Sequence, residues 1–229
     1  MSELKPNGQR AKKAILWIWI VLAFEAVSCF LSCIEYGIYQ SIINGVDVPE
    51  EVIDANDTGS FIVASLAILV FIISVVMFIK WFRRAYQNLH QSVSHRLLYS
   101  EGWAAGSWFV PILNIYRPYR IMKELYLETK KLLVKRGMDM NLSLATVFVG
   151  WWWALWIIDG ILGRASWKCT MWALRLDTPE AWMTSAMVDI ISGIAGILSA
   201  LITVKVIKDY SKAEALLAEN QGWNTDGTD

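Results

Sequence analysis

Residues 60–82 read SFIVASLAILVFIISVVMFIKWF, an apolar run whose first charged residue is Lys80. An α-helix needs about 20 mostly apolar residues to cross a hydrocarbon core of roughly 30 Å, so this run predicts a transmembrane helix. Three further stretches meet the same criterion, at residues 14–39, 141–163 and 184–207. The sequence therefore predicts an all-α integral membrane protein with four transmembrane helices, whose first partner is the lipid bilayer.

The composition of the 229-residue chain agrees with this fold class. Apolar residues make up 55% of the chain and charged residues 18%, whereas soluble globular proteins have roughly 45–50% and about 25%. The 21 basic and 21 acidic residues balance, which argues against nucleic acid as a partner. Three cysteines are too few for a disulfide-rich secreted domain.

The distribution of Lys and Arg predicts the orientation, because basic residues concentrate on the cytoplasmic side of membrane proteins. With both termini cytoplasmic, every Lys and Arg lies inside except Arg164, Lys168 and Arg175. A fifth crossing after the second span would nearly equalise the two sides. We therefore expect a cytoplasmic N-terminus (1–13), connection (83–140) and tail (208–229), an acidic outer loop (40–59) and a second outer loop (164–183).

The cytoplasmic connection is expected to contain two helices. Residues 83–101 form an amphipathic pattern that either lies against lipid headgroups or simply extends the second span. Residues 120–140 form a basic helix, whose charges either attract anionic lipid or are solvated and fix the topology. The candidate lipid-headgroup residues are Arg83, Arg84, Lys130, Lys131, Lys135 and Arg136.

Between these helices, residues 102–119 read GWAAGSWFVPILNIYRPY. The apolar part is too short to cross a membrane, and Pro111 and Pro118 interrupt regular helix. Irregular backbone survives at membrane depth only where protein or water satisfies it. The segment is therefore predicted to be re-entrant or interfacial, and to pack against the spans from the cytoplasmic side.

The residues of this segment resemble a known family. Its motif consists of Gly102, Trp103, Gly106, Trp108, Phe109, Pro111, Asn114 and Pro118. Together with the WFRRA run at residues 81–85 and the Trp-rich third span, this motif resembles domain-of-unknown-function family 4328 over roughly residues 61–211. The resemblance implies a multi-span bacterial membrane protein, which places it in the inner membrane. It implies no particular activity.

Four carboxylates inside the predicted spans are the strongest functional lead: Glu25, Glu35, Asp159 and Asp189. Charged groups are costly within a bilayer and usually face the interior of a helix bundle. Glu25, near the middle of its span, could hold a proton or cation in a cavity, or accept a hydrogen bond between helices. The other three lie nearer the outer side and could line a vestibule with Arg164 as counter-ion.

The fourth span carries a stripe of small residues, Ser192, Gly196 and Ala200, which predicts close helix packing within one chain or between the chains of a homo-oligomer. In the third span, the adjacent tryptophans at 151–153 are expected to anchor at the membrane interface. Neither a nucleophile–base pair nor a phosphate loop or metal-ligand pattern is recognisable, so no catalytic residue, metal or cofactor is expected.

These observations favour a non-enzymatic membrane scaffold, sensor or assembly subunit that acts through its cytoplasmic helices and a cytosolic protein partner. The alternative is an oligomeric channel or small transporter that uses Glu25 and the re-entrant segment. An enzyme acting on lipid is a lesser alternative.

Overall fold

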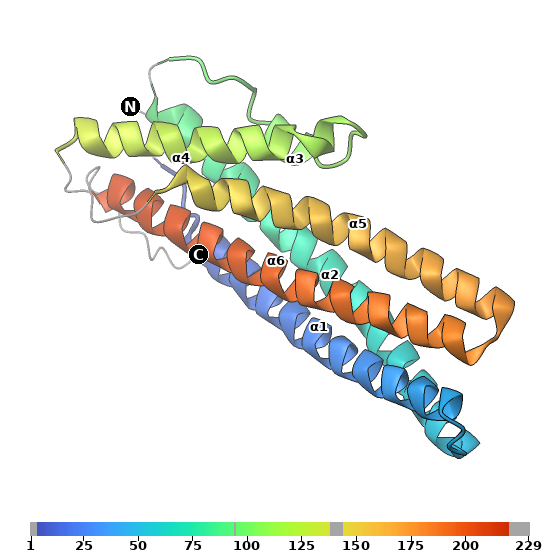
Figure 1. Ribbon diagram of the computed structural model, residues 1–229. Coiled ribbons are helices and arrows are strands. Elements are labelled where there is room, and N and C mark those ends of the chain that lie inside the picture. Colours follow the sequence, from blue (N-terminus) through green and yellow to red (C-terminus); the bar gives the residue numbers. More distant parts are fainter. Residues whose placement is uncertain (1–3, 94, 138–143, 220–229) are drawn as a thin grey trace. The chain divides into compact units, whose positions relative to one another are not determined.

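The computed structural model describes residues 4–93, 95–137 and 144–219, and these form an all-helical fold (Figure 1). The four long helices are α1 (Gly8–Ile43), α2 (Glu50–Ser92), α5 (Thr146–Leu176) and α6 (Pro179–Glu219). Three shorter elements connect α2 to α5: α3 (Trp103–Gly106), the 3-10 helix η1 (Leu113–Ile115) and α4 (Arg117–Lys135). The ends of three predicted cytoplasmic segments, at residues 1–3, 138–140 and 220–229, lie outside the described residues.

Each of the four long helices contains a stretch that is long and apolar enough to cross a membrane, which confirms the predicted apolar helices. The shortest helix, α5, has 31 residues and the longest, α2, has 43. At a rise of 1.5 Å per residue these helices span roughly 45–65 Å, more than the roughly 30 Å of a hydrocarbon core. Each helix therefore continues beyond its apolar stretch.

Helices extend into both of the predicted outer loops. Segment 40–59 is helical except for residues 44–49, and segment 164–183 is helical except for Asp177 and the residue after it. The predicted bounds follow the apolar stretch, whereas a helix continues until its backbone leaves the helical conformation. Gly45 and Asp177 have positive φ angles of 80° and 48°, a conformation that Gly and, less often, Asp adopt at helix ends.

The chain divides into two compact units, and each long helix contributes to both. Unit 1 comprises residues 1–18, 73–153 and 202–229, and therefore contains the whole connection between α2 and α5. Unit 2 comprises residues 19–72 and 154–201, and contains the connections from α1 to α2 and from α5 to α6.

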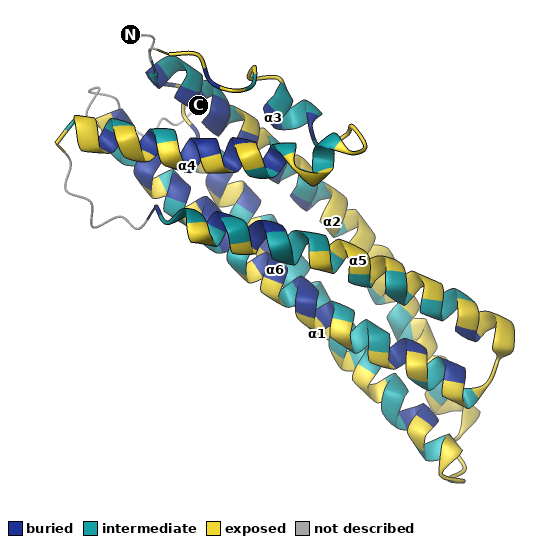
Figure 2. Ribbon diagram, turned by 45° about the horizontal axis from the view of Figure 1, so that its top comes forward, coloured by how far each residue is buried: buried dark blue, intermediate teal, exposed yellow. Residues whose placement is uncertain are grey.

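Unit 1 has a core of large aromatic side chains. Trp81, Phe82 and Tyr86 of α2 are fully buried, as are Tyr126 of α4 and Tyr210 of α6. Figure 2 shows the buried residues that line these helices. The apolar face of residues 83–92 thus lies in the core of unit 1 and continues α2. The alternative in which this face lies on lipid headgroups was wrong, because protein covers it.

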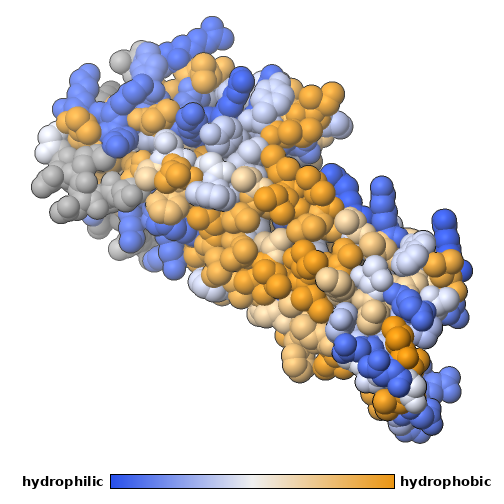
Figure 3. Space-filling model, viewed as in Figure 1, coloured by the Kyte–Doolittle hydropathy of each residue, from blue (hydrophilic) through white to orange (hydrophobic). Residues whose placement is uncertain are grey.

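Unit 2 leaves large apolar side chains on its outer surface. On α2, Phe61 is 73% exposed and Ile68 61% exposed. Figure 3 shows apolar side chains gathered over the long helices on the face in view. Contiguous apolar surface of this kind marks a region that contacts lipid or another protein.

Candidate functional site

A cavity of about 350 Å³ lies within unit 2. Three of the four predicted carboxylates line it, namely Glu25 and Glu35 of α1 and Asp189 of α6. Hydroxyl side chains from all four long helices complete the polar lining: Ser28, Ser32, Ser60, Ser166, Thr170 and Ser192. The lining residues include one aromatic side chain, Trp167, and no Lys, Arg or His.

The fourth carboxylate, Asp159 of α5, lies beside Glu25 at a glycine of α6. A Cβ placed on Gly196 would lie 3.1 Å from Cδ and Oε2 of Glu25 and 3.5 Å from Oδ1 of Asp159. One turn earlier, a Cβ on Gly193 would lie 3.1 Å from the Cβ of Cys29. The absence of side chains at these two positions therefore creates the room in which α1 and its carboxylate approach α6.

The predicted stripe of small residues thus packs within one chain at Gly196. Ser192, one turn before it, lines the cavity, and Ala200, one turn after it, is buried. All three residues belong to unit 2, together with the segment of α1 that carries Glu25. The stripe consequently shapes the carboxylate cavity.

A hydroxyl group, rather than a cation, pairs with one of the carboxylates of this cavity. The hydroxyl of Ser166 donates a hydrogen bond to Asp189. Arg164, which was predicted to be a counter-ion, is exposed and is not among the lining residues. Carboxylates removed from water without a basic partner are neutralised by a proton or by a bound cation. The cavity is therefore suited chemically to cationic species.

The cavity is less suited to a bare metal ion. Within the described part of the chain, no group of three or more His, Cys, Asp or Glu side chains is close enough together to hold one. A volume near 350 Å³ is in the range of pockets for small organic ligands. Trp167, which is 65% exposed, also lines the cavity.

The predicted re-entrant or interfacial segment belongs to unit 1 and is built on its aromatic core. The ring of Trp108 lies 5.6 Å from that of Phe78 on α2 and 6.2 Å from that of Trp153 on α5. The indole nitrogen of Trp153 donates to the backbone carbonyl of Ile115 at 2.9 Å. These contacts fix the segment to helices that are distant from it in sequence.

The other motif residues surround this attachment. Trp103 lies under the guanidinium of Arg117, 3.9 Å from the ring centroid, and Pro118 is buried in the first turn of α4. Phe109 and Pro111 are exposed. Asn114 and Gly106 are half-buried, while a Cβ on Gly102 would meet open space.

The six candidate lipid-headgroup residues do not form one site. Four are exposed: Arg83, Lys130, Lys131 and Lys135. Arg136 donates from Nη1 to the carbonyl of Leu217 at 3.1 Å, which ties the end of α4 to α6. Arg84 is half-buried, and this burial lowers the pKa of its guanidinium, as do the nearby charges of Arg10 and Arg83.

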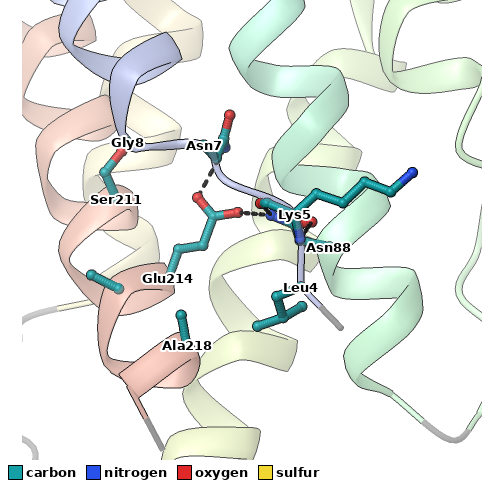
Figure 4. A pocket seen from close by; sticks show the side chains of 9 residues that line it. Leu4, Lys5, Asn7, Gly8, Asn88, Ser211, Glu214 and Ala218 are labelled. Carbon is teal, nitrogen blue, oxygen red and sulfur yellow. Dashed lines mark hydrogen bonds between the residues drawn. The ribbon is translucent and has the colours of Figure 1, made fainter. Parts of the chain in front are cut away.

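A second polar cluster in unit 1 was missed by the sequence analysis (Figure 4). The buried carboxylate of Glu214 on α6 accepts hydrogen bonds from Nδ2 of Asn88 at 2.7 Å and from Nδ2 of Asn7 at 2.9 Å. The amide of Asn88 also accepts from the backbone nitrogen of Lys5 and donates to its carbonyl, at 3.1 and 2.8 Å. Asn88 thereby joins the N-terminal segment to α2 and α6.

The cluster surrounds a cavity of about 40 Å³, enough for water alone. Burial raises the pKa of Glu214 to about 7, although hydrogen bonds from both asparagines and the charge of Arg84 act in the opposite direction. A sequence signal was present, because Glu214 follows Ile207 and Tyr210 on a helical stripe whose other members are buried. A polar residue on such a stripe predicts a buried hydrogen-bonding partner.

Comparisons with known proteins give one result beyond the fold. No curated protein and no solved structure matches the chain. A family profile described as "Domain of unknown function (DUF4328)" matches residues 44–212, which include α2 to α5, the motif segment, Asp159, Asp189 and most of α6. The chain therefore belongs to the DUF4328 family, as the motif from Gly102 to Pro118 predicted.

Proposed function

We propose that this protein is a non-enzymatic integral membrane protein of a bacterial inner membrane, and that its unit 2 binds a small organic cation in exchange for protons. Its role is then that of a channel or small transporter. The observation that carries the proposal is the cavity lined by Glu25, Glu35 and Asp189 without a basic residue.

The charge of the two units supports this proposal. Unit 2 contains eleven acidic residues and three basic ones, whereas unit 1 contains ten acidic and eighteen basic residues. An excess of one sign raises the local concentration of ions of the other sign, so the field of unit 2 favours cations near its cavity. The basic excess of unit 1 favours a cytoplasmic position for it and for both chain termini.

The exposed surfaces also favour a channel or transporter over a scaffold. A scaffold acting on a cytosolic partner has to use the apolar residues that unit 1 leaves exposed, such as Phe109, Ile112 and Val134, because the aromatic faces of α2 and α4 are buried. The exposed apolar surface of unit 2 fits lipid or a second copy of the chain. Because four helices offer few walls for a complete pathway, the proposal includes a homo-oligomer.

Binding of a permanently charged amine to the purified protein in nanodiscs tests the proposal. The probe is radiolabelled tetraethylammonium, measured by equilibrium dialysis. We expect saturable binding that weakens by about tenfold or more in Glu25→Gln and in Asp189→Asn, since a removed carboxylate in a low-dielectric site costs over 1.4 kcal/mol. Proton flux measured with a pH-sensitive dye in proteoliposomes should fall in parallel.

The matched control is Asp47→Asn, which removes the same charge from unit 2 at an exposed position outside the cavity. This variant should bind and transport as the unchanged protein does. Equal losses in Asp47→Asn and Glu25→Gln would show that only the overall charge matters. Absence of saturable binding and of flux in all variants would refute the proposal and leave the scaffold function.

A further inference from the structure

The loop between α3 and α4, whose course Figure 1 shows, carries exposed apolar side chains at its tip. Phe109 is 74% exposed and Ile112 is 73% exposed, and Ile115 behind them is 56% exposed. All three follow Trp108, whose ring packs into the aromatic core of unit 1. The tip is thus attached to the core through Trp108, while its own apolar side chains are left exposed by the described residues.

The backbone at the tip is strained. Ile112 has φ 69° and ψ −49°, and the amide of Leu113 donates to the carbonyl of Pro111 at 2.8 Å. This geometry is the classic γ-turn, which is rare and unfavourable, and a positive φ is a genuine outlier for a β-branched residue. Strain of this kind persists where the surroundings enforce it, and it concentrates at functional positions.

Most of the backbone amides of residues 108–116 are satisfied locally. The amides of Trp108 and Phe109 donate to carbonyls of the preceding turn, and those of residues 113–116 donate to carbonyls between Val110 and Leu113. Exposed backbone donors prevent insertion into lipid, because no water is present there to pair with them. Local pairing of these amides removes much of that obstacle.

Cations stacked on aromatic rings follow the tip at the start of α4. Arg117 lies over Trp103 at 3.9 Å, Arg120 over the ring of Tyr116 at 5.3 Å, and Lys123 over Tyr119 at 5.9 Å. Arg120 and Lys123 are exposed. Tyr and Trp beside Arg and Lys are typical of the headgroup level of a membrane, where the cations complement lipid phosphates.

The loop is attached to α5 at Trp153, within the stretch predicted to cross the membrane. We propose that residues 108–116 form a wedge that inserts Phe109 and Ile112 into the boundary between headgroups and acyl chains, and that Arg120 and Lys123 bind the phosphates of anionic lipids around it. This inference rests on the proposed membrane insertion of the long helices. It makes the segment an interfacial anchor and excludes a re-entrant pore lining.

Depth-dependent quenching in nanodiscs tests the wedge. Cys29, Cys33 and Cys169 are replaced by Ser, and a single Cys carrying nitrobenzoxadiazole is placed at position 109, 98 or 158. Leu98 is also 74% exposed but lies beside Glu124, farther along α4, and Ile158 is a 46% exposed residue of α5. The quenchers are lipids with nitroxide near the headgroup or deep in the acyl chain, and aqueous iodide.

At position 109 we expect at least twofold stronger quenching by the shallow nitroxide than by the deep one, and protection from iodide. Position 158 should be quenched by the deep nitroxide, and position 98 by iodide. If position 158 responds as expected but 109 is quenched by iodide, the wedge is wrong while membrane insertion stands. Strong quenching of position 109 by the deep nitroxide would indicate a re-entrant segment. Protection of position 109 from every quencher would indicate that protein covers it. Either result overturns the wedge.

The lipid contact is tested by phosphatidylglycerol in the nanodisc. Its addition should increase shallow quenching at position 109, and Arg120→Gln with Lys123→Gln should abolish that increase. The matched control is Lys130→Gln with Lys131→Gln, two exposed cations later in the same helix, which should retain it. Equal effects of both pairs would refute a specific contact near the wedge.

Discussion

The protonation of Glu214 leads to the sharpest prediction of stability. Its two oxygens accept hydrogen bonds from Asn88 and Asn7 in a buried site, yet no basic side chain forms a salt bridge with it among the described residues. Burial therefore outweighs the hydrogen bonds and the charge of Arg84, and the pKa of this carboxyl rises from 4.5 to about 7. The nearby Tyr210, whose own pKa is raised, stays neutral at these pH values.

The sign and size of the effect follow from linkage. The folded chain binds the proton of Glu214 more tightly than the unfolded chain does, so the free energy of unfolding falls as the pH rises between 4.5 and about 7. The stabilisation by the proton is complete below the pKa of Glu214 in the unfolded chain, 4.5, and is lost above its pKa in the folded chain, about 7. At about 1.4 kcal/mol per pKa unit, the loss is about 3.5 kcal/mol, or roughly 7–14 °C in the unfolding midpoint.

The perturbation is Glu214→Gln, which mimics the protonated state at every pH. Oδ1 of Asn7 has no hydrogen-bond partner, so rotation of that amide lets it accept from the new Gln. Thermal unfolding in nanodiscs from about pH 5 to about pH 8 should show the unchanged protein losing more stability with rising pH than the variant does. Above pH 7 the variant should be the more stable of the two.

The control is Glu219→Gln, which changes an exposed carboxylate on the same helix and should leave the pH dependence intact. Parallel pH profiles for the unchanged protein and Glu214→Gln would refute the reasoning. A variant that is less stable at every pH would show that both acceptor oxygens matter more than the charge.

Two further changes test the N-terminal contact and the strained turn. Asn88→Ala removes both hydrogen bonds to Lys5 and one to Glu214, so it should destabilise the chain by roughly 2–3 kcal/mol; faster amide exchange across residues 4–8 should accompany this loss, and unchanged exchange there would contradict the contact. Ile112→Gly relieves the positive φ and should raise stability in detergent by roughly 1 kcal/mol, whereas Ile112→Val should not. Equal unfolding midpoints for Gly and Val would argue against strain.

The sequence was sufficient to predict the apolar helices and the family, because both depend on local patterns. A run such as residues 60–82 is apolar on every face, and its length alone decides its class. The motif around Trp108 was also recognisable in one contiguous segment. The ends of the helices were not recognisable in this way. α5 continues to Leu176, beyond its apolar stretch, and hydropathy does not indicate where a helix stops outside such a stretch.

The sequence identified individual carboxylates of the cavity but not which of them lie close together. The sequence indicated that Glu25, Asp159 and Asp189 were unusual, because a carboxylate in an apolar span is costly. It did not show that Glu25 and Asp159 approach the same glycine, since this depends on how α1 and α5 pack on α6. The contact of Asn7 with Glu214 joins positions 207 residues apart, which no local pattern reports.

The tryptophans of α5 differ in burial, and two of them belong to the core of unit 1. Trp151 is 61% exposed, as an interfacial anchor should be, but Trp152 and Trp153 beside it are buried in the core of unit 1. In the core of unit 1, each large aromatic side chain buries roughly 150–250 Å². Trp108 and Trp152 pack against each other from different segments, 6.4 Å apart, and truncating the buried Trp152 to Ala should cost about 3–5 kcal/mol. The aromatic density is thus explained by packing, whereas the carboxylates of unit 2 are costly to bury and have no such structural explanation.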